Sequence, residues 1–572
     1  MIIIAAVLTC MISAQAVEHE EIKRGQKAYG LTVFADDKVE KFDLELVGVL
    51  DNFLGPKQDL ILAKLTDPRL EQAGVVAGMS GSPVYFNGKL LGSLGYALGT
   101  FMKEGYCGIT PIAAMREVRD LPRRDPFVAA HCGSAVSSVL PIAAPLSVGG
   151  VDSEVLRYFA PIFEKMGFVV APTATGSGNA EDHSSTDSLK SQSGLKPGDA
   201  VSAELVRGDV TVAATGTVTS VDGSHVLAFG HPFLGAGAIT LPMAATSILA
   251  IIPSFQRSFK LGQVGKKIGT FTQDRLTAMS GELGLAAQIL PVKVEVREEE
   301  HQPHRYEYEV ARDPKLTPEL VQLVLASSFA RQTDAGVVGT AALSAQVTLV
   351  DGNLLELHEN VAMDRDLSVP ILAALTISRS IDLLWHNDFG PPLVKAMSVK
   401  ADLSRVNLAR RIDVLQVRNS RLAPGENLSL RVGLRTENEP LHFEEISVLM
   451  TSPVTAGDYE LTVCSANEAN QIENRIGGPA KPQSADELIQ ALRGQRTNGF
   501  LYVLLVGRGP SLRVGETLLT KVPLSFATQM ISGEGDQRLS HNPESIVLEQ
   551  NYQLLGVVMG SAQASIHIRE HR

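Results

Sequence analysis

The sequence of 572 residues predicts a mainly β fold with a few helices, ending in a β-sandwich region. Glycine (50 residues) and proline (29) are frequent enough to place turns between many short strands. Apolar and polar residues alternate in several short runs, which is typical of strands with one buried face. Helical spacing of apolar residues is confined to a few segments. Because the chain is too long for one hydrophobic core, we expect several domains.

The N-terminal part of the chain consists of short β-type runs separated by turns. We expect strands at 31–34, 41–47 and 60–65, and the alternation in the second run predicts a half-buried face. Apolar residues then recur at helical spacing over 153–168, opening after Asp152-Ser153, so one helix is expected there. The polar, Ser/Gly-rich stretch 173–194 predicts a flexible linker.

The middle of the chain returns to strands and then to helices. Short strands are expected over 200–229, with a hairpin turn at 221–224. Thr317 followed by Pro318 is a helix start, because threonine caps the first turn and proline fits the first helical position. That helix should end near Ala330, and a second helix is expected over 370–385.

The last part of the chain has the pattern of a β-sandwich. Runs of alternating residues occupy 412–417, 428–434 and 459–463, and the first two are joined by a Pro-Gly turn at 423–426. One helix is expected over 484–493, because Ser484 and Glu487 form a capping box.

Charge and composition exclude several classes of function. The net charge of −12 argues against a nucleic-acid partner, since phosphate binding requires a basic face. The spacing of cysteine and histidine shows no metal-binding motif, so neither a metal nor another cofactor is expected. Beyond Cys10 the cysteines are Cys107, Cys132 and Cys464, of which Cys107 and Cys132 either form a disulfide or are small buried residues.

The N-terminus has the features of a secretory signal. Residues 2–11 are almost wholly apolar but too few to span a bilayer, and cleavage is expected after Ala16. No later segment reaches about 18 uninterrupted apolar residues. We therefore expect an exported protein, periplasmic or extracellular, with no integral membrane segment in its mature chain.

The segment from Gly78 to Pro83 is the best candidate for a catalytic turn. Its glycines let the backbone turn sharply, so that amides face a substrate carbonyl instead of pairing in a sheet. Ser80 is the candidate nucleophile, and the backbone amides of Gly78 and Ser80 are the candidate oxyanion hole. Ser82 is the alternative candidate for the nucleophile, but it lies where the turn should already be leaving the oxyanion hole.

A serine nucleophile requires a base, and the base requires a group that fixes its tautomer. His231 is the best candidate base, because it follows an apolar run and is held between Gly230 and Pro232. His225 is the alternative, near the tip of a predicted hairpin. Asp67 follows the strand that precedes Ser80 and is the candidate orienting acid. Taken alone, each of these residues is also compatible with an ordinary turn.

These motifs resemble the SpoIVB family of serine peptidases. The resemblance covers about residues 25–290 and is carried by 38–47, 65–67, 78–83 and 87–92, then by 216–219 and 229–231. It implies a trypsin-like double β-barrel with Ser80 as nucleophile, His231 as base and Asp67 as orienting acid. In the sporulation enzyme the His segment precedes the Asp and Ser segments, whereas here it follows them, and no PDZ-like domain is recognisable.

The resemblance and the sequence pattern together predict six segments. These are a signal peptide (1–16), a β-barrel half with Asp67 and Ser80 (25–150), a helix and flexible linker (151–195), a β-barrel half with His231 (196–300), a mixed connecting region (301–399) and a β-sandwich accessory region (400–572). The predicted function is an exported serine endopeptidase that cleaves protein or peptide substrates, including itself within 173–194. The alternatives are a non-catalytic binding or scaffold protein with a peptidase fold, and a structural protein of the cell envelope.

Overall fold

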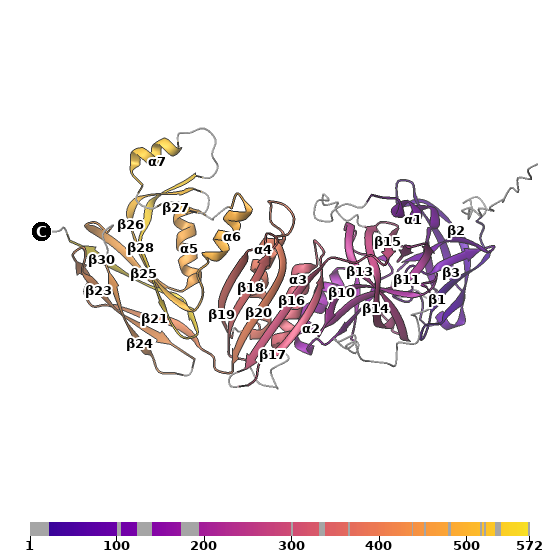
Figure 1. Cartoon of the computed structure of the whole chain (residues 1–572), viewed down its shortest axis with the longest axis horizontal. Helices are drawn as coiled ribbons and strands as arrows, with labels where there is room; N and C mark the ends of the chain where they lie inside the picture. The colour runs from indigo at the N-terminus through magenta and orange to yellow at the C-terminus, as the bar shows by residue number, and fades with distance from the viewer. Residues whose placement is uncertain are drawn as a thin grey trace, which may run out of the picture. The chain divides into compact units, whose positions relative to one another are not determined.

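The computed structural model divides the chain into two compact units (Figure 1). Unit 1 comprises residues 1–290 and 308–320, and unit 2 comprises 291–307 and 321–572. The structure describes residues 22–71, 73–99, 104–122, 140–172, 194–298, 301–330, 338–363, 367–437, 439–450, 454–478, 482–514, 517–519, 522–531 and 539–569. The predicted signal peptide, most of the predicted linker and Cys132 lie outside these residues. No helix in the described ranges is both long and apolar enough to cross a membrane.

The first half of unit 1 is a closed barrel of six strands. Neighbouring strands are antiparallel, and the ring closes because β4 pairs with both β1 and β5. The six strands are β1 (Lys27–Val33), β2 (Val39–Gly55), β3 (Gln58–Leu65), β4 (Pro83–Phe86), β5 (Lys89–Ala97) and β6 (Tyr106–Pro111). Phe42, Leu44 and Leu46 of β2 point into the barrel core, as the alternation in this run predicted.

The second half of unit 1 is also a closed barrel of six antiparallel strands. They are β10 (Ala200–Gly208), β11 (Thr211–Asp222), β12 (His225–Ala228), β13 (Gly237–Ile252), β14 (Phe259–Arg275) and β15 (Ala278–Leu283). Numbered within each barrel, the strands follow the same ring order, 1-2-3-6-5-4, in both. This confirms the double β-barrel that the sequence predicted.

Shorter elements surround and connect the barrels of unit 1. They are β7 (Leu140–Pro141), β8 (Ala144–Gly149), β9 (Phe168–Pro172), the 3-10 helix Pro68–Leu70, α1 (Ile112–Arg119) and α2 (Ser153–Lys165). Helix α2 is the predicted connecting helix, and the Asp152 side chain caps it by accepting the amide of Glu154 at 2.8 Å. The strand β17 (His304–Ala311) pairs with β10 through residues 308–310.

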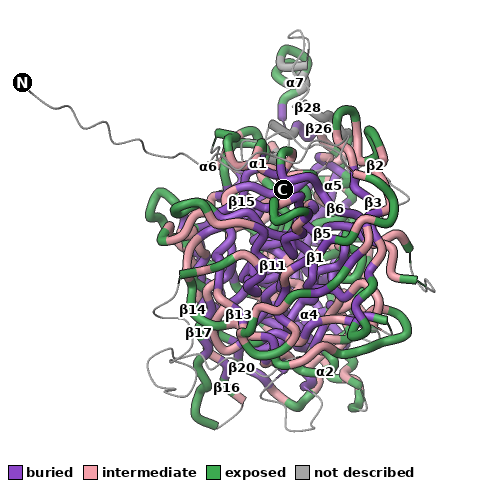
Figure 2. Tube along the Cα trace, turned by 90° about the vertical axis from the view of Figure 1, so that its right-hand side faces the viewer, coloured by how far each residue is buried: buried purple, intermediate pink, exposed green. Residues whose placement is uncertain are grey.

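The two barrels are joined to each other by backbone pairing. Asp36, after β1, forms an antiparallel bridge with Ile248 of β13. Ala77, just before the candidate catalytic turn, forms a parallel bridge with Phe259 at the start of β14. Figure 2 marks buried residues in purple, and most residues of β5 and β11 are buried. The candidate turn is therefore held between the barrels.

Unit 2 begins with strands that pair in the order β19-β18-β20-β16. The strands are β16 (Ile289–Glu298), β18 (Thr340–Leu349), β19 (Leu354–Ala362) and β20 (Val394–Ser404), and helix α4 (Val369–Trp385) belongs to the same region. Helix α3 (Thr317–Ala330) begins in unit 1, which includes residues 308–320, and ends in unit 2. Helix α4 packs against β18, β19 and β20. Helix α3 begins at Thr317 and ends at Ala330, as its Thr-Pro start predicted.

The remainder of unit 2 is a β-sandwich, as predicted. One sheet contains β21 (Ala409–Val417), β23 (Asn427–Arg435), β24 (His442–Leu449) and β29 (Val557–Met559). The other contains β22 (Arg421–Leu422), β25 (Gly457–Cys464), β26 (Phe500–Val514), β27 (Thr517–Leu519), β28 (Leu539–Gln553) and β30 (Ser561–Ile568). Apolar residues of both sheets, such as Leu430 and Val463, form one core.

The described residues between the sandwich strands also form the helices α5 (Ala466–Gly477), α6 (Ala485–Arg493) and α7 (Leu524–Ile531). Helix α5 covers the outer face of β26, where Ile472 and Ile476 pack with Tyr502 and Leu504. Helix α6 is the predicted one, and the Ser484 hydroxyl accepts the amide of Glu487 at 3.1 Å.

Candidate active site

The predicted catalytic turn connects the third and fourth strands of the first barrel. Gly78 and Gly81 have φ angles of +92° and +91°, in the left-handed region that favours glycine. Gly81 has a second constraint, because a Cβ atom there would lie 2.0 Å from the carbonyl oxygen of Thr217. The turn therefore requires glycine at position 81 both for its backbone angle and for its contact with β11.

The backbone amides of this turn alternate between paired and unpaired. The amide of Met79 donates to Val76, that of Gly81 to Leu94 and that of Ser82 to Met79, at 2.7–3.0 Å. Within the described part of the chain, the amides of Gly78 and Ser80 have no acceptor. A buried amide without an acceptor costs free energy, so this pattern is unusual in a protein interior. The unpaired amides are the two that the sequence analysis gave as candidate oxyanion donors.

Both serines of the turn are fully buried, and neither hydroxyl has a hydrogen-bond partner among the described residues. Their backbones differ. Ser82 is held in the first barrel by both its amide and its carbonyl, which accepts the amide of Leu94 at 2.9 Å. Ser80 is held only by its carbonyl, which accepts the amide of Thr217 at 2.8 Å. Ser80 therefore combines an unpaired hydroxyl with an unpaired amide.

His231 occupies the corresponding position in the second barrel, between its third and fourth strands. Its turn contains two successive left-handed residues, Phe229 (φ +67°) and Gly230 (φ +69°). The Thr110 hydroxyl of β6 donates to the Gly230 carbonyl at 2.6 Å, and a Cβ at Gly230 would lie 2.2 Å from the Ser93 hydroxyl oxygen of β5. The chain thus brings the His231 turn back against the barrel that carries Ser80.

The imidazole of His231 is buried in a largely apolar environment. Its ring meets the rings of Phe229 and Tyr96 edge-on, with centroid distances of 6.2 and 6.4 Å. Burial lowers the pKa of His231 to about 4, because charging the ring without water is unfavourable. At neutral pH the ring is therefore uncharged.

The hydrogen bonds of His231 define its tautomer. Nδ1 lies 2.7 Å from the carbonyl oxygen of Pro232. Since a carbonyl oxygen can only accept, Nδ1 carries the proton and Nε2 carries the lone pair. Nε2 is buried and has no partner among the residues that the structure describes, so no direct bond joins it to Ser80. An unpaired Nε2 lone pair is what a general base requires.

Asp67 does not contact His231 in the structure. It caps the 3-10 helix after β3, and its carboxylate accepts the Arg69 amide at 2.9 Å, Nε at 3.0 Å and Nη2 at 2.9 Å. These bonds to Arg69 lower the pKa of the Asp67 carboxyl. The role of orienting acid, predicted for Asp67, requires its carboxylate to exchange Arg69 for His231. The alternative base, His225, is exposed at the start of β12.

Lys260, at the start of β14, is a site residue that the sequence did not reveal. Its amide donates to the Ala77 carbonyl at 3.0 Å, and its side chain lies beside Gly78. Its Nζ donates to the hydroxyls of Thr32 (2.6 Å) and Thr217 (3.5 Å), and burial lowers the pKa of Lys260 to about 7. A lysine in an amphipathic run predicts an exposed side chain, so the sequence pattern did not indicate that Lys260 is buried beside the candidate turn.

Asp274, at the other end of β14, is the second unforeseen residue. Its carboxylate is buried and accepts the amides of Phe233 (2.7 Å), Leu234 (2.7 Å) and Ala236 (3.1 Å). Asp274 therefore fixes the loop that follows His231. The local sequence Gln-Asp-Arg is typical of an exposed hairpin end, so only the fold identifies this position.

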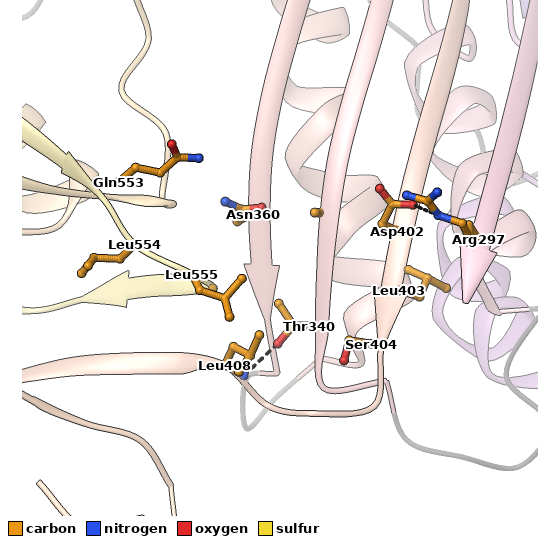
Figure 3. A pocket seen from close by; sticks show the side chains of 12 residues that line it. Arg297, Thr340, Asn360, Asp402, Leu403, Ser404, Leu408, Gln553, Leu554 and Leu555 are labelled. Atoms are coloured by element: carbon orange, nitrogen blue, oxygen red, sulfur yellow. Dashed lines mark hydrogen bonds and ion pairs between the residues drawn. The ribbon is translucent and has the colours of Figure 1, made fainter. Parts of the chain in front are cut away.

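The cavity in Figure 3 lies wholly within unit 2 and is lined by none of the predicted site residues. Several of its polar groups already have partners: Arg297 pairs with Asp402 at 2.7 Å, and the Thr340 hydroxyl accepts the amide of Leu408 at 2.8 Å.

Comparison with known proteins finds a family match in the N-terminal part of the chain. The family model described as SpoIVB peptidase S55 matches residues 9–114, which include Asp67, Gly78 and Ser80. No curated protein and no solved structure matches the chain. The match ends before His231, so it does not bear on the base. The resemblance stated from the sequence is thus confirmed over residues 9–114, a segment that is similar to the SpoIVB peptidase S55 family.

Proposed function

We propose that this chain is an exported serine endopeptidase that cleaves protein substrates through an acyl-enzyme on Ser80. One observation carries the proposal: in the described part of unit 1, the unpaired polar groups include the Ser80 hydroxyl, the amides of Gly78 and Ser80, and Nε2 of His231. These are the groups that acyl transfer requires as nucleophile, oxyanion donors and base. They lie on corresponding connections of two barrels that pack together.

The proposed reaction uses these groups in sequence. Ser80 Oγ attacks the substrate carbonyl while its proton passes to Nε2 of His231. The carbonyl oxygen becomes negative and accepts the amides of Gly78 and Ser80, whose bonds strengthen as the charge develops. His231 then protonates the departing amine, and water activated by the same nitrogen releases the acyl group from Ser80. The neutral ring of His231 is ready to accept the first proton at neutral pH.

Cleavage of an unfolded protein such as casein tests this proposal. We expect fragments with the wild-type protein and a loss of rate of about 10⁴-fold or more in Ser80→Ala and His231→Ala, as for other members of a catalytic unit. Ser82→Ala and His225→Ala are the matched controls and should retain the activity. Cleavage that persists in Ser80→Ala would overturn the proposal.

Self-processing and export form part of the same proposal. The polar segment 173–194 is the proposed self-cleavage site, because polar, Ser/Gly-rich segments are readily nicked. Purified wild-type protein should convert to two fragments that Ser80→Ala lacks, and identical fragments in both would exclude self-processing. Export predicts a mature N-terminus after Ala16, which N-terminal sequencing of the protein from cell fractions would detect.

A second function, that of a non-catalytic binding or scaffold protein, is favoured by one observation. Ser80 is fully buried and makes no hydrogen bond with His231 in the structure, while Asp67 is bound to Arg69. Catalysis therefore requires a movement that admits substrate and brings Ser80 and His231 together. A folded wild-type protein that cleaves neither casein nor itself would support this second function.

A further inference from the structure

The loop that follows His231 is fastened to one buried carboxylate. Asp274 accepts three amides of this loop, and its two oxygens divide them: Oδ1 binds Phe233, and Oδ2 binds Leu234 and Ala236. Burial raises the pKa of Asp274, and the bonds from the loop amides oppose that shift. The phenyl ring of Phe233 is also fixed, at 5.7 Å from the Phe229 ring. The start of the loop is thus held by the Asp274 carboxylate through its amides and by the Phe229 ring through the side chain of Phe233.

One peptide group connects Asp274 to the imidazole of His231. The carbonyl of Pro232 and the amide of Phe233 belong to the same planar, trans unit, so the two groups point in opposite directions. The amide side donates to Asp274 at 2.7 Å, and the carbonyl side accepts Nδ1 of His231 at 2.7 Å. If the carboxylate holds the amide, the carbonyl must face the imidazole. Hydrogen bonds in such a chain also polarise one another, which makes the carbonyl a better acceptor.

The requirement for a group that fixes the histidine tautomer is therefore already met without Asp67. A serine–histidine pair depends on a third group that keeps the proton on Nδ1. Asp67 gives its carboxylate to Arg69 in the structure. Among the described residues, the group that contacts Nδ1 of His231 is the Pro232 carbonyl.

We propose that Asp274 is a positioning residue that holds His231 in the Nδ1–H tautomer through the peptide group between Pro232 and Phe233. The carboxylate acts one step away from the imidazole, with a backbone amide as the intermediary. The catalytic consequence rests on the proposed peptidase function, whereas the tautomer itself does not. Asp274→Asn keeps the shape but replaces one acceptor oxygen with a donor NH₂ group, so it cannot bind all three amides.

Nitrogen NMR of ¹⁵N-histidine-labelled full-length protein tests the proposal without relying on activity. The signal of His231 is identified by its loss in His231→Gln. We expect a protonated Nδ1 and an unprotonated Nε2 in the wild type, and a mixture of both tautomers in Asp274→Asn. Asp199→Asn is the matched control, because Asp199 is another buried carboxylate that accepts a backbone amide, that of Lys196 at 2.8 Å. It should leave the His231 signals unchanged.

The kinetic readout is a split between kcat and KM. Asp274→Asn should lower kcat about 10- to 100-fold, which is the usual loss when a residue that orients a functional side chain is replaced. KM should stay unchanged. Asp199→Asn should change neither. A wild-type His231 protonated on Nε2 would overturn the proposal even if Asp274→Asn failed to fold, and so would an unchanged tautomer in a folded Asp274→Asn. A wild type with the expected tautomer but no peptidase activity would refute the proposed function alone.

Discussion

At the scale of single residues, the burial of His231 governs how activity should depend on pH. Its pKa is lowered to about 4, below the ordinary value of 6.5, so the base stays neutral over a wider acidic range. The acidic limb of a kcat/KM profile, which reports the free enzyme, should therefore fall near pH 4. A limb near pH 6.5 would show that the imidazole is solvated in the active form.

The same lowered pKa affects stability. Between pH 4 and 6.5 the unfolded chain binds a proton on this histidine that the folded chain does not, so lowering the pH through this window destabilises the fold. The contribution of His231 is complete above pH 6.5. Urea unfolding of the wild type and of His231→Gln at pH 7 and pH 5 should therefore show different changes in the free energy of unfolding between the two pH values.

Thr217 should act on the oxyanion hole through the backbone. Its hydroxyl donates to the Gly78 carbonyl at 2.9 Å, which fixes the peptide group after Gly78. Thr217→Val removes that bond at nearly constant volume, so we expect a drop in kcat of about 10-fold, equivalent to about 1.4 kcal/mol, with KM unchanged. Thr217→Ser should restore the rate.

A control separates this effect from general destabilisation. Thr215 lies two residues earlier on β11, and its hydroxyl bonds Ser202 at 2.9 Å. Thr215→Val should reduce stability by about 1 kcal/mol and leave kcat unaffected. Equal losses of kcat in both valine variants would contradict a specific role for Thr217.

Lys260 should make the fold more stable as the pH rises. Its pKa is about 7 in the folded protein and 10.5 ordinarily, so between these values only the unfolded chain binds the proton. A tenfold difference in proton affinity between the two states corresponds to about 1.4 kcal/mol. The free energy of unfolding of the wild type should therefore rise between pH 7 and 10, and Lys260→Met should flatten that rise. Lys266→Met, at an exposed position of the same strand, should keep the wild-type slope.

At the scale of elements, the candidate catalytic turn packs closely against β11, where Gly81 meets the backbone of Thr217. Gly81→Ala should cost about 2–5 kcal/mol, because it adds a contact with the Thr217 carbonyl to the strain of a left-handed angle. Gly88→Ala separates the two causes, since Gly88 has φ +75° with nothing within 4 Å of a Cβ, and should cost only about 1–2 kcal/mol. Thermal unfolding measures both, and equal losses would contradict the fitted contact.

Elements with a local signal were predictable from the sequence. Helix α3 follows from Thr317 and Pro318, and α6 from the capping box at Ser484. The buried face of β2 follows from alternation. Helix α5 was missed, because its apolar stripe is short (Ala469, Ile472 and Ile476) and exists to cover β26.

The candidate site was predictable only in part. Ser80 and His231 lie in glycine-containing turns whose residue types carry information. The sequence around Asp274 and Lys260 carries no such information, because their burial arises from contacts between segments distant in the chain. These contacts join β14 to the His231 loop and β14 to Ala77. No local pattern reveals such pairings.

At the scale of the whole molecule, unit 1 repeats one barrel topology, and each barrel carries one of the two candidate turns. Both barrels have the same ring order, and Ser80 and His231 lie on the same connection of their respective barrels. Exchanging the two barrels along the chain would therefore keep one candidate turn on each. The order of Ser80 and then His231 is thus compatible with the reverse order expected for the sporulation enzyme that the sequence resembles. One active site shared by two barrels is compatible with either order.

Reaction of the full-length protein with a fluorophosphonate probe, followed by peptide mapping, tests the central claim most directly. An activated serine beside an oxyanion hole should form one adduct per chain, on Ser80. The adduct should be absent in Ser80→Ala and His231→Ala and retained in Ser82→Ala. A folded wild-type protein that forms no adduct, or forms it on Ser82, would contradict a peptidase centred on Ser80.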